Sequence, residues 1–263
     1  MEKFKLYLIA LRNVFLGGNI ISLSLITKPS LFIGNISILL FYFKTLSNKG
    51  RLEQKNPDEI LNSNKKYEIK IDTDCYFWGN DPSYVKDIIT LCLITKLIEA
   101  KNIFEIGTLD GYTALHFAMN SSENTKVYSL DLPLDGSEAP SLRSTVIDEL
   151  HQKGHSIVRK YKFRIPGINE KVVILFGDSA KFDYKPYLKK IDLFFIDGAH
   201  SYEYVKSDTE KAFECVRGGG IIVWHDYGRM GVNGVTKWLH ELNSKGYKIY
   251  SVPGSSLAFH IVG

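Results

Sequence analysis

The chain has 263 residues, enough for one large domain with its own core and a further segment. Its apolar content of 44% and charged content of 24% are typical of a globular protein. A net charge of +4 is far from a nucleic-acid signature, so we expect no nucleic-acid partner. Cys75, Cys92 and Cys215 are far apart without CxxC spacing, which argues against a disulfide framework or a zinc site and indicates reduced, cytosolic thiols.

Residues 4–46 are rich in Leu, Ile and Phe, but polar residues interrupt each apolar run. A membrane-spanning helix needs about 20 mostly apolar residues, and none of these runs qualifies. A secretory signal is not indicated either, because a small-residue cleavage site is missing. Two interpretations stay open: a packed helical extension that covers the main domain or a homodimer partner, and an interfacial anchor in peripheral contact with a membrane. We favour the packed extension and expect a cytoplasmic protein, membrane-associated if the anchor interpretation holds.

Residues 47–70 are polar and lysine-rich, and they predict a linker or surface segment. The expected organisation is therefore an apolar helical extension with its linker over residues 1–70, followed by a main domain over residues 71–263. A helix is predicted over residues 82–99, because Asp81 and Pro82 are good start signals and apolar residues then recur at helical spacing.

From residue 102 onward, short apolar strands alternate with helices. Strands are predicted at 102–106, 126–131, 171–176, 191–196, 220–224, 248–252 and 257–262. Helices are predicted at 112–120, 144–153, 184–189, 201–216 and 232–245. This alternation predicts a Rossmann-like, doubly wound α/β fold, in which a seven-stranded, mostly parallel sheet has helices on both faces. Such sheets bind ligands beyond the carboxyl ends of their strands.

The segment from Glu105 to Gly111 ends the first of these strands and opens a helix. Gly107 can adopt backbone angles that a side chain forbids, and Gly111 lets the helix start lie close to a ligand. The GxxxG spacing differs from the GxGxxG of dinucleotide enzymes, which argues against a pyrophosphate. A sulfonium nucleoside with an amino-acid tail fits better, with Glu105 binding its ammonium group directly or through water. An ordinary glycine-bearing turn would show the same spacing.

Two more acidic residues stand at the ends of the next strands. Asp131 ends the strand 126–131, where an acid typically binds both ribose hydroxyls. Asp178 follows the strand 171–176 and can accept a hydrogen bond from an adenine amino group, while Ser179 lines the ring. Each acid alone is equally explained as a cap of a turn or helix. The three strand-end acids in order are more specific and favour a nucleoside ligand.

A second cluster follows two later strands: Asp197 and His200 after 191–196, and His225 and Asp226 after 220–224. Neighbouring strands bring both pairs to one edge of the sheet, so Asp197, His225 and Asp226 form a predicted divalent-metal set. Carboxylates suit magnesium, manganese or calcium, and an imidazole tolerates manganese or a transition metal. His200 can act as a general base near neutral pH. The alternative is that Asp197 caps the helix at 201 and His225 is hydrogen-bonded within the sheet edge.

These motifs together resemble the class I S-adenosylmethionine-dependent methyltransferases, particularly a bacterial group with an IDGxHSYExVxxD stretch and a later GGxIxxHDY stretch. Here the two stretches read IDGAHSYEYVKSD at 196–208 and GGIIVWHDY at 219–227. EIGTLDGYTAL at 105–115 and FGDSAKFD at 176–183 fit as well. The resemblance covers about residues 82–262 and leaves residues 1–70 outside.

The resemblance implies methyl transfer from S-adenosylmethionine to a hydroxyl group of the acceptor, which is a small molecule or a sugar. The donor-binding residues it implies are Glu105, Gly107, Thr108, Gly111, Asp131, Asp178, Ser179 and Asp197. Related metal-dependent O-methyltransferases carry an acid at the place of Asp197 and an acidic or amide pair at the place of His225 and Asp226. The histidine is a departure that leaves magnesium or manganese dependence open. Catechol enzymes carry a lysine base where this chain has His200, so His200 and Asp197 are the expected catalytic residues.

Residues 134–170 form a long insertion that we expect to fold over the acceptor as a lid or wall. Its basic residues suit an anionic or sugar-like acceptor, although solvated surface charge explains them more simply: Arg143, Arg159, Lys160, Lys162 and Arg164. Two other functions stay open. One is a nicotinamide-dependent oxidoreductase, against which the missing GxGxxG argues, and the other is a non-catalytic module that binds the nucleoside or associates with a membrane.

Overall fold

The computed structural model describes residues 52–72, 82–133, 135–145, 148–149, 167–229 and 232–263. These residues lie in one compact unit, which begins at Leu52. The apolar segment 4–46 lies outside the described residues, as do Cys75, most of the helix predicted at 144–153 and the four basic residues from Arg159 to Arg164. Within the described part of the chain, none of the helices is long and apolar enough to cross a membrane.

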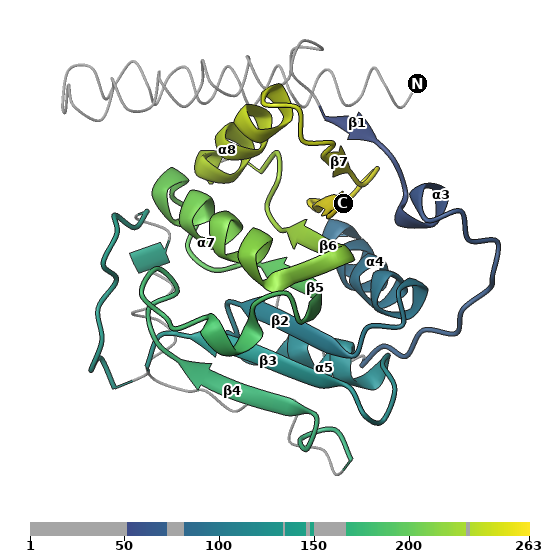
Figure 1. The fold of residues 1–263 in the computed structure, drawn as a ribbon, viewed down its shortest axis with the longest axis horizontal. Coiled ribbons are helices and arrows are strands. Elements are labelled where there is room, and N and C mark those ends of the chain that lie inside the picture. The colour runs from purple at the N-terminus through teal and green to yellow at the C-terminus, as the bar shows by residue number, and fades with distance from the viewer. Residues whose placement is uncertain (1–51, 73–81, 134, 146–147, 150–166, 230–231) are drawn as a thin grey trace. The chain divides into compact units, whose positions relative to one another are not determined.

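The described unit is built on an eight-stranded sheet (Figure 1). Its strands are β1 (Glu53–Gln54), β2 (Asn102–Ile106), β3 (Lys126–Asp131), β4 (Val172–Phe176), β5 (Ile191–Ile196), β6 (Val216–Trp224), β7 (Tyr250–Ser251) and β8 (Ala258–Ile261). The order across the sheet is β1-β7-β8-β6-β5-β2-β3-β4. All neighbours pair in parallel except β8, which runs antiparallel to β6 and to β7.

Helices cover both faces of the sheet (Figure 1). They are α3 (Pro57–Ile60), α4 (Pro82–Leu97), α5 (Tyr112–Met119), the 3-10 turn η2 (Lys185–Tyr187), α7 (Tyr202–Cys215) and α8 (Asn233–Ser244). Alternate residues of each strand point to opposite faces. Leu193 and Phe195 of β5 therefore pack in a core with α4 and α5, while Phe194 and Ile196 pack in a second core with α7 and α8. The predicted doubly wound fold is confirmed.

The strand order reverses at β2, which pairs with β3 on one side and with β5 on the other. The chain builds β2, β3 and β4 outward in one direction and then returns to place β5 and β6 on the opposite side of β2. Because these five strands are parallel, their carboxyl ends meet at one edge of the sheet. Every motif predicted from the sequence lies in a loop that leaves this edge.

The sheet differs from the predicted one in its outer strands. It has eight strands and not seven, because β1 lies in the segment predicted to be a linker and pairs with β7. Both residues of β1 are exposed, so this edge strand shows no apolar alternation that a sequence pattern could reveal. In addition, β7 is shorter than predicted, and β6 begins at Val216 and not at residue 220.

Candidate active site

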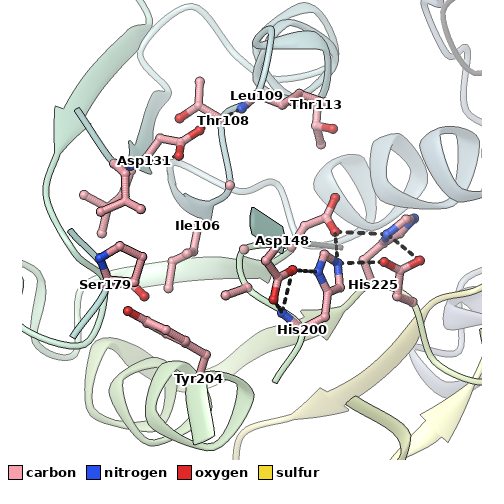
Figure 2. A pocket seen from close by; sticks show the side chains of 18 of the residues that line it. Ile106, Thr108, Leu109, Thr113, Asp131, Asp148, Ser179, His200, Tyr204 and His225 are labelled. Carbon is pink, nitrogen blue, oxygen red and sulfur yellow. Dashed lines mark hydrogen bonds and ion pairs between the residues drawn. The ribbon is translucent and has the colours of Figure 1, made fainter. Parts of the chain in front are cut away.

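A cavity of about 420 Å³ opens at the carboxyl ends of β2 to β6. Each of the five strand-end loops contributes to its wall (Figure 2). Asp131 and Ser179 lie on one side of the cavity, and His200 and His225 lie on the other. The first side, formed by the loops after β2, β3 and β4, is called the nucleoside half below. The second side, formed by the loops after β5 and β6, is called the histidine half.

Gly107 is the point at which the two halves touch. Its φ is +100°, and a Cβ placed there would lie 2.0 Å from the backbone oxygen of Asp197. A backbone hydrogen bond fixes the same contact, since the Asp197 amide donates to Ile106 at 2.9 Å, while the Gly107 amide ties the loop to Leu130 of β3 at 2.9 Å. A side chain at this position would push the loops after β2 and β5 apart, so only glycine fits.

Asp131 holds the glycine loop in place. Its carboxylate accepts the amide of Leu109 at 3.0 Å and the amide of Leu132 at 2.8 Å. Leu109 has a φ of +50°, a left-handed conformation that is unfavourable for a leucine. Asp131 thus compensates strain in the loop and also lines the cavity, and its contact with a ribose stays a prediction.

Glu105 lies behind the cavity wall and not in it. Its side chain is fully buried, and its Oε2 accepts a 2.5 Å hydrogen bond from Ser129, whose hydroxyl also meets Thr108 Oγ1 at 2.8 Å. Burial raises the pKa of Glu105 well above its ordinary value, because the hydroxyl of Ser129 offsets only part of the desolvation. Glu105 does not line the cavity, unlike Gly107 and Thr108, so its contact with the ligand stays a prediction.

Asp178 joins three segments at the far wall of the nucleoside half. Its carboxylate accepts the amide of Ser141 at 2.8 Å, the amide of Ala180 at 3.1 Å and the phenol of Tyr204 at 3.0 Å. Although burial opposes the charge, these hydrogen bonds lower the pKa of Asp178. Asp178 and the neighbouring Ser179 both line the cavity, and their contact with an adenine ring stays a prediction.

The histidine half brings together the predicted residues of the last two loops. His200 Nε2 lies 2.8 Å from Asp226 Oδ2 and 3.9 Å from Asp197 Oδ1. Its Nδ1 lies 2.6 Å from Asp148 Oδ1. Burial opposes a charge on the ring, but the two hydrogen-bonded carboxylates outweigh it and raise the pKa of His200 to about 10. With no cation at Asp197 and Asp226, this arrangement favours the imidazolium form, and the role of His200 as a base stays a prediction.

His225 lies between the carboxylates of Asp197 and Asp226 on one side of its ring and the buried carboxylate of Asp87 on the other. Its Nδ1 is 3.0 Å from Asp197 Oδ1 and 3.3 Å from Asp226 Oδ1, while its Nε2 is 3.1 Å from Asp87 Oδ2. Burial opposes protonation, yet Asp197 and Asp226 raise the pKa of His225 well above its ordinary value. The backbone amide of His225 also donates to Ile196 at 3.1 Å, so the residue is hydrogen-bonded within the sheet edge while its ring meets these carboxylates.

Asp197, His225 and Asp226 each offer one ligand atom, and these atoms lie within 4.8 Å of one another. A hydrogen bond to Asp87 places the proton of a neutral His225 on Nε2 and leaves the lone pair of Nδ1 facing the two carboxylates. Nδ1 is buried without a hydrogen bond of good geometry. This donor set of one imidazole and two carboxylates fits a divalent cation of the manganese or magnesium type.

The local backbone at Ser201 and Asp226 positions the side chains of the histidine half. The Ser201 hydroxyl accepts the amide of Tyr204 at 3.2 Å and caps α7, so Asp197 is not the cap and is free of that role. Asp226 has a φ of +59°, which turns the chain sharply after β6. Arg229 Nε pairs with Asp226 Oδ1 at 3.0 Å and contributes to the cavity wall.

Comparison with known proteins matches residues 104–227 to the family of the methyltransferase domain. Caffeoyl-CoA O-methyltransferase 2 of Petunia hybrida is 25% identical over 183 residues, which are 59% of this chain and 73% of that protein. Among solved structures, one assigned as an O-methyltransferase from Klebsiella pneumoniae covers 70% of this chain and 83% of its own at a TM-score of 0.50 and 18% identity. The O-methyltransferase NovP covers 68% of this chain and 80% of its own at 0.51 and 14%.

The matched span runs from β2 to Tyr227 and includes all the residues that line the cavity except Tyr84 and Arg229. The two structures share the fold. The chain is a class I S-adenosylmethionine-dependent methyltransferase. The methyltransferase takes its methyl group from S-adenosylmethionine, and the nicotinamide oxidoreductase considered from the sequence is set aside.

The methyltransferase contains site residues that the sequence did not reveal. Asp87 lies on α4, far along the chain from the histidine it contacts, and Asp148 lies in the insertion, where an isolated acid carries no motif. Tyr204 belongs to the SYExV stretch and could have been found there. Arg143, by contrast, is exposed and does not line the cavity, so solvated surface charge accounts for it.

Proposed function

We propose that this methyltransferase transfers the methyl group of S-adenosylmethionine to a hydroxyl oxygen of a small molecule. The observation that carries the proposal is one shared cavity, in which the glycine loop and the strand-end acids Asp131 and Asp178 face two histidines and two aspartates. The nucleoside half is proposed to hold the donor through Gly107, Thr108, Gly111, Asp131, Asp178 and Ser179. Among these residues, Gly111 takes a φ of +76° at the start of α5 and does not itself line the cavity.

The acceptor hydroxyl is proposed to lie beside His200 and Asp197. His200 Nε2 lies 2.8 Å from Asp226 Oδ2. If a cation neutralised the charge of Asp197 and Asp226, the imidazole would be neutral and its Nε2 would take the hydroxyl proton. The imidazolium then remains next to the acceptor oxygen and stabilises its negative charge. Attack on the sulfonium methyl needs chiefly alignment, which the contact between Gly107 and Asp197 supplies by fixing the two halves against each other.

We further propose that Asp197, His225 and Asp226 hold a magnesium or manganese ion. Such a cation supplies positive charge that stabilises an acceptor oxyanion and draws carboxylate charge away from His200. Asp87 and Arg229 support the set from behind, since Asp87 binds His225 Nε2 and Arg229 binds Asp226. The histidine in the set suits manganese better than a site built of oxygens alone.

The acceptor class is open between phenols and sugars. The Petunia relative is named for caffeoyl-CoA, which makes a phenolic hydroxyl the first choice. We therefore propose measuring release of S-adenosylhomocysteine by the purified full chain with caffeoyl-CoA, catechol and a set of hexoses. Each reaction is run with EDTA and with added manganese. Turnover that EDTA abolishes and manganese restores supports the whole proposal, and turnover insensitive to EDTA removes the metal from it.

Substitution of the base and a calorimetric titration separate the remaining alternatives. His200→Ala is expected to lower kcat by about 100-fold or more, because general-base assistance is worth that much. His260→Ala serves as the matched control, because His260 lies on β8 and does not line the cavity. Full turnover in His200→Ala overturns the base assignment. Absence of heat on titration with S-adenosylmethionine would instead favour a non-catalytic module.

A further inference from the structure

Asp148 is an acidic residue of the insertion that nevertheless lies buried against the histidine half. Its relative exposure is 5%, whereas its neighbour Glu149 is exposed. Its carboxylate accepts the backbone amide of His200 through both oxygens, at 3.2 and 3.3 Å. The same carboxylate meets His200 Nδ1 at 2.6 Å (Figure 2). One side chain of the insertion thus grips His200 at both its backbone and its ring.

The contact with Asp148 determines which ring nitrogen of His200 is turned toward the cavity. An ionised carboxylate can only accept, so the Nδ1 that meets Asp148 carries a hydrogen. The other nitrogen, Nε2, then points to Asp226 and to the cavity. A fixed tautomer and ring orientation are what a histidine base requires from a carboxylate partner.

Asp148 is itself held in position by its own segment. Its Oδ2 accepts the amide of Thr145 at 2.8 Å, and its amide donates to Thr145 Oγ1 at 3.1 Å. The three amide and ring donors leave neither oxygen free to rotate away. A few residues earlier, Ser141 donates to Asp178 and Leu142 donates to the Tyr204 hydroxyl. Ser141 and Leu142 therefore contact residues at the nucleoside half, while Asp148 contacts the histidine half.

We propose that Asp148 is the positioning residue of His200, holding a hydrogen on Nδ1 and presenting Nε2 to the acceptor. This inference rests on the proposed function for its catalytic consequence, but the orientation itself can be measured without any acceptor. A merely structural Asp148 would tie the insertion to the domain and leave the ring of His200 indifferent to the charge of residue 148.

The test uses Asp148→Asn in the full chain. Asparagine keeps the shape, but it has one acceptor oxygen, so its NH₂ group faces either the His200 ring or the Thr145 amide. The matched control is Glu149→Gln, which removes the adjacent exposed carboxylate. Long-range ¹H–¹⁵N spectra of the imidazole rings report the hydrogen on Nδ1, and His200→Asn assigns the signals by their loss. Titration with S-adenosylmethionine and thermal unfolding report the fold.

The expected result is a protected Nδ1–H signal of His200 in the wild type and in Glu149→Gln that is lost in Asp148→Asn. S-Adenosylmethionine affinity should stay within about threefold, and kcat with caffeoyl-CoA should fall by about 30-fold or more at little changed KM. Asp148→Glu should restore part of both. An unchanged His200 signal in Asp148→Asn overturns the inference, as does loss of donor binding together with the fold. A lost signal combined with full turnover of His200→Ala keeps the positioning and overturns only the proposed base.

Discussion

The two halves of the cavity are built by different means. In the nucleoside half, the important contacts join a side chain to the backbone, as when Asp131 accepts the amides of Leu109 and Leu132. In the histidine half, side chains meet side chains that come from distant segments, including Asp87 of α4 and Asp148 of the insertion. The first half is thus shaped by loop geometry and the second by tertiary packing. Substitutions in the nucleoside half should therefore disturb the backbone of the loops, and substitutions in the histidine half should disturb contacts between side chains.

The largest effect is expected for Gly107→Ala, which places a methyl group in the contact between the two halves. The new Cβ would lie 2.0 Å from the Asp197 oxygen, which is backbone and cannot yield without separating β2 from β5. We expect a loss of about 3 kcal/mol or more in unfolding free energy, or a loss of S-adenosylmethionine binding by about 100-fold. Urea unfolding and calorimetric titration measure the two.

Gly136→Ala is the control for this substitution. Its φ of +71° carries a similar backbone strain, but a Cβ there meets nothing within 4 Å. It should cost only about 1 kcal/mol, since left-handed strain is its sole penalty. If Gly107→Ala behaved like Gly136→Ala, the nucleoside half would not be shaped by its backbone, and the contrast between the halves would collapse.

The same contrast explains which parts of the molecule the sequence could predict. The strand-end positions of Asp131, Asp178 and Asp197 follow from local alternation, because parallel strands bring their carboxyl ends together. Asp87 and Asp148 could not be predicted as site residues, since no local pattern indicates which helix or insertion residue will contact a given histidine. The charge of His200 escaped for the same reason, as it depends on these long-range partners. The strand β1 escaped because its two residues are exposed at an edge.

The second largest effect is expected for Asp87→Asn, which tests whether a distant buried carboxylate holds His225 in the histidine half. Asp87 is buried, and it accepts His225 Nε2 as well as the backbone amide and hydroxyl of Ser256. Removing its charge weakens the hold on His225, so manganese affinity should fall about 10- to 100-fold. Electron paramagnetic resonance of free Mn²⁺ measures this, and S-adenosylmethionine affinity should be unchanged.

Asp192→Asn controls for the loss of a buried carboxylate. Asp192 lies at the opposite end of β5, where it accepts the amides of Lys101 and Asn102 and pairs with Arg217. Both variants should lose stability, but only Asp87→Asn should lose manganese. Equal manganese affinity in the two variants would show that Asp87 serves the fold alone.

A smaller effect concerns Asp208, which ends the IDGAHSYEYVKSD stretch and lies behind both halves. A Cβ at Gly198 would come within 3.8 Å of its Oδ2, and burial raises its pKa from 3.8 to about 7, against the smaller effect of Ser179. Because the folded pKa is raised, the unfolded chain releases this proton first as pH increases. The contribution of Asp208 to stability is thus complete below about pH 4 and lost as pH rises through about 7.

Asp208→Asn should remove this pH dependence while keeping the shape of the side chain. Relative to the wild type, the variant should gain on the order of 4 kcal/mol in unfolding free energy between pH 4 and pH 8. Urea unfolding at several pH values measures the difference, in which the titration of all other groups cancels. A constant difference across this range would mean that Asp208 is ionised in the folded protein at all these pH values.

The smallest effect is expected for Tyr204→Phe, which asks whether the two halves act independently. The variant keeps the ring but removes the hydroxyl that donates to Asp178 at 3.0 Å and accepts the Leu142 amide at 3.3 Å. S-Adenosylmethionine affinity should fall about threefold, the value of one modest hydrogen bond. Tyr202→Phe, two residues earlier on α7 and bonded to Glu241, should leave donor affinity unchanged. Manganese affinity and the His200 Nδ1–H signal should be the same in both variants, because neither touches a side chain of the histidine half. If Tyr204→Phe alone weakened the His200 signal, the contacts of Leu142 and Asp148 would be coupling donor binding to the base, and the halves would have to be treated as one.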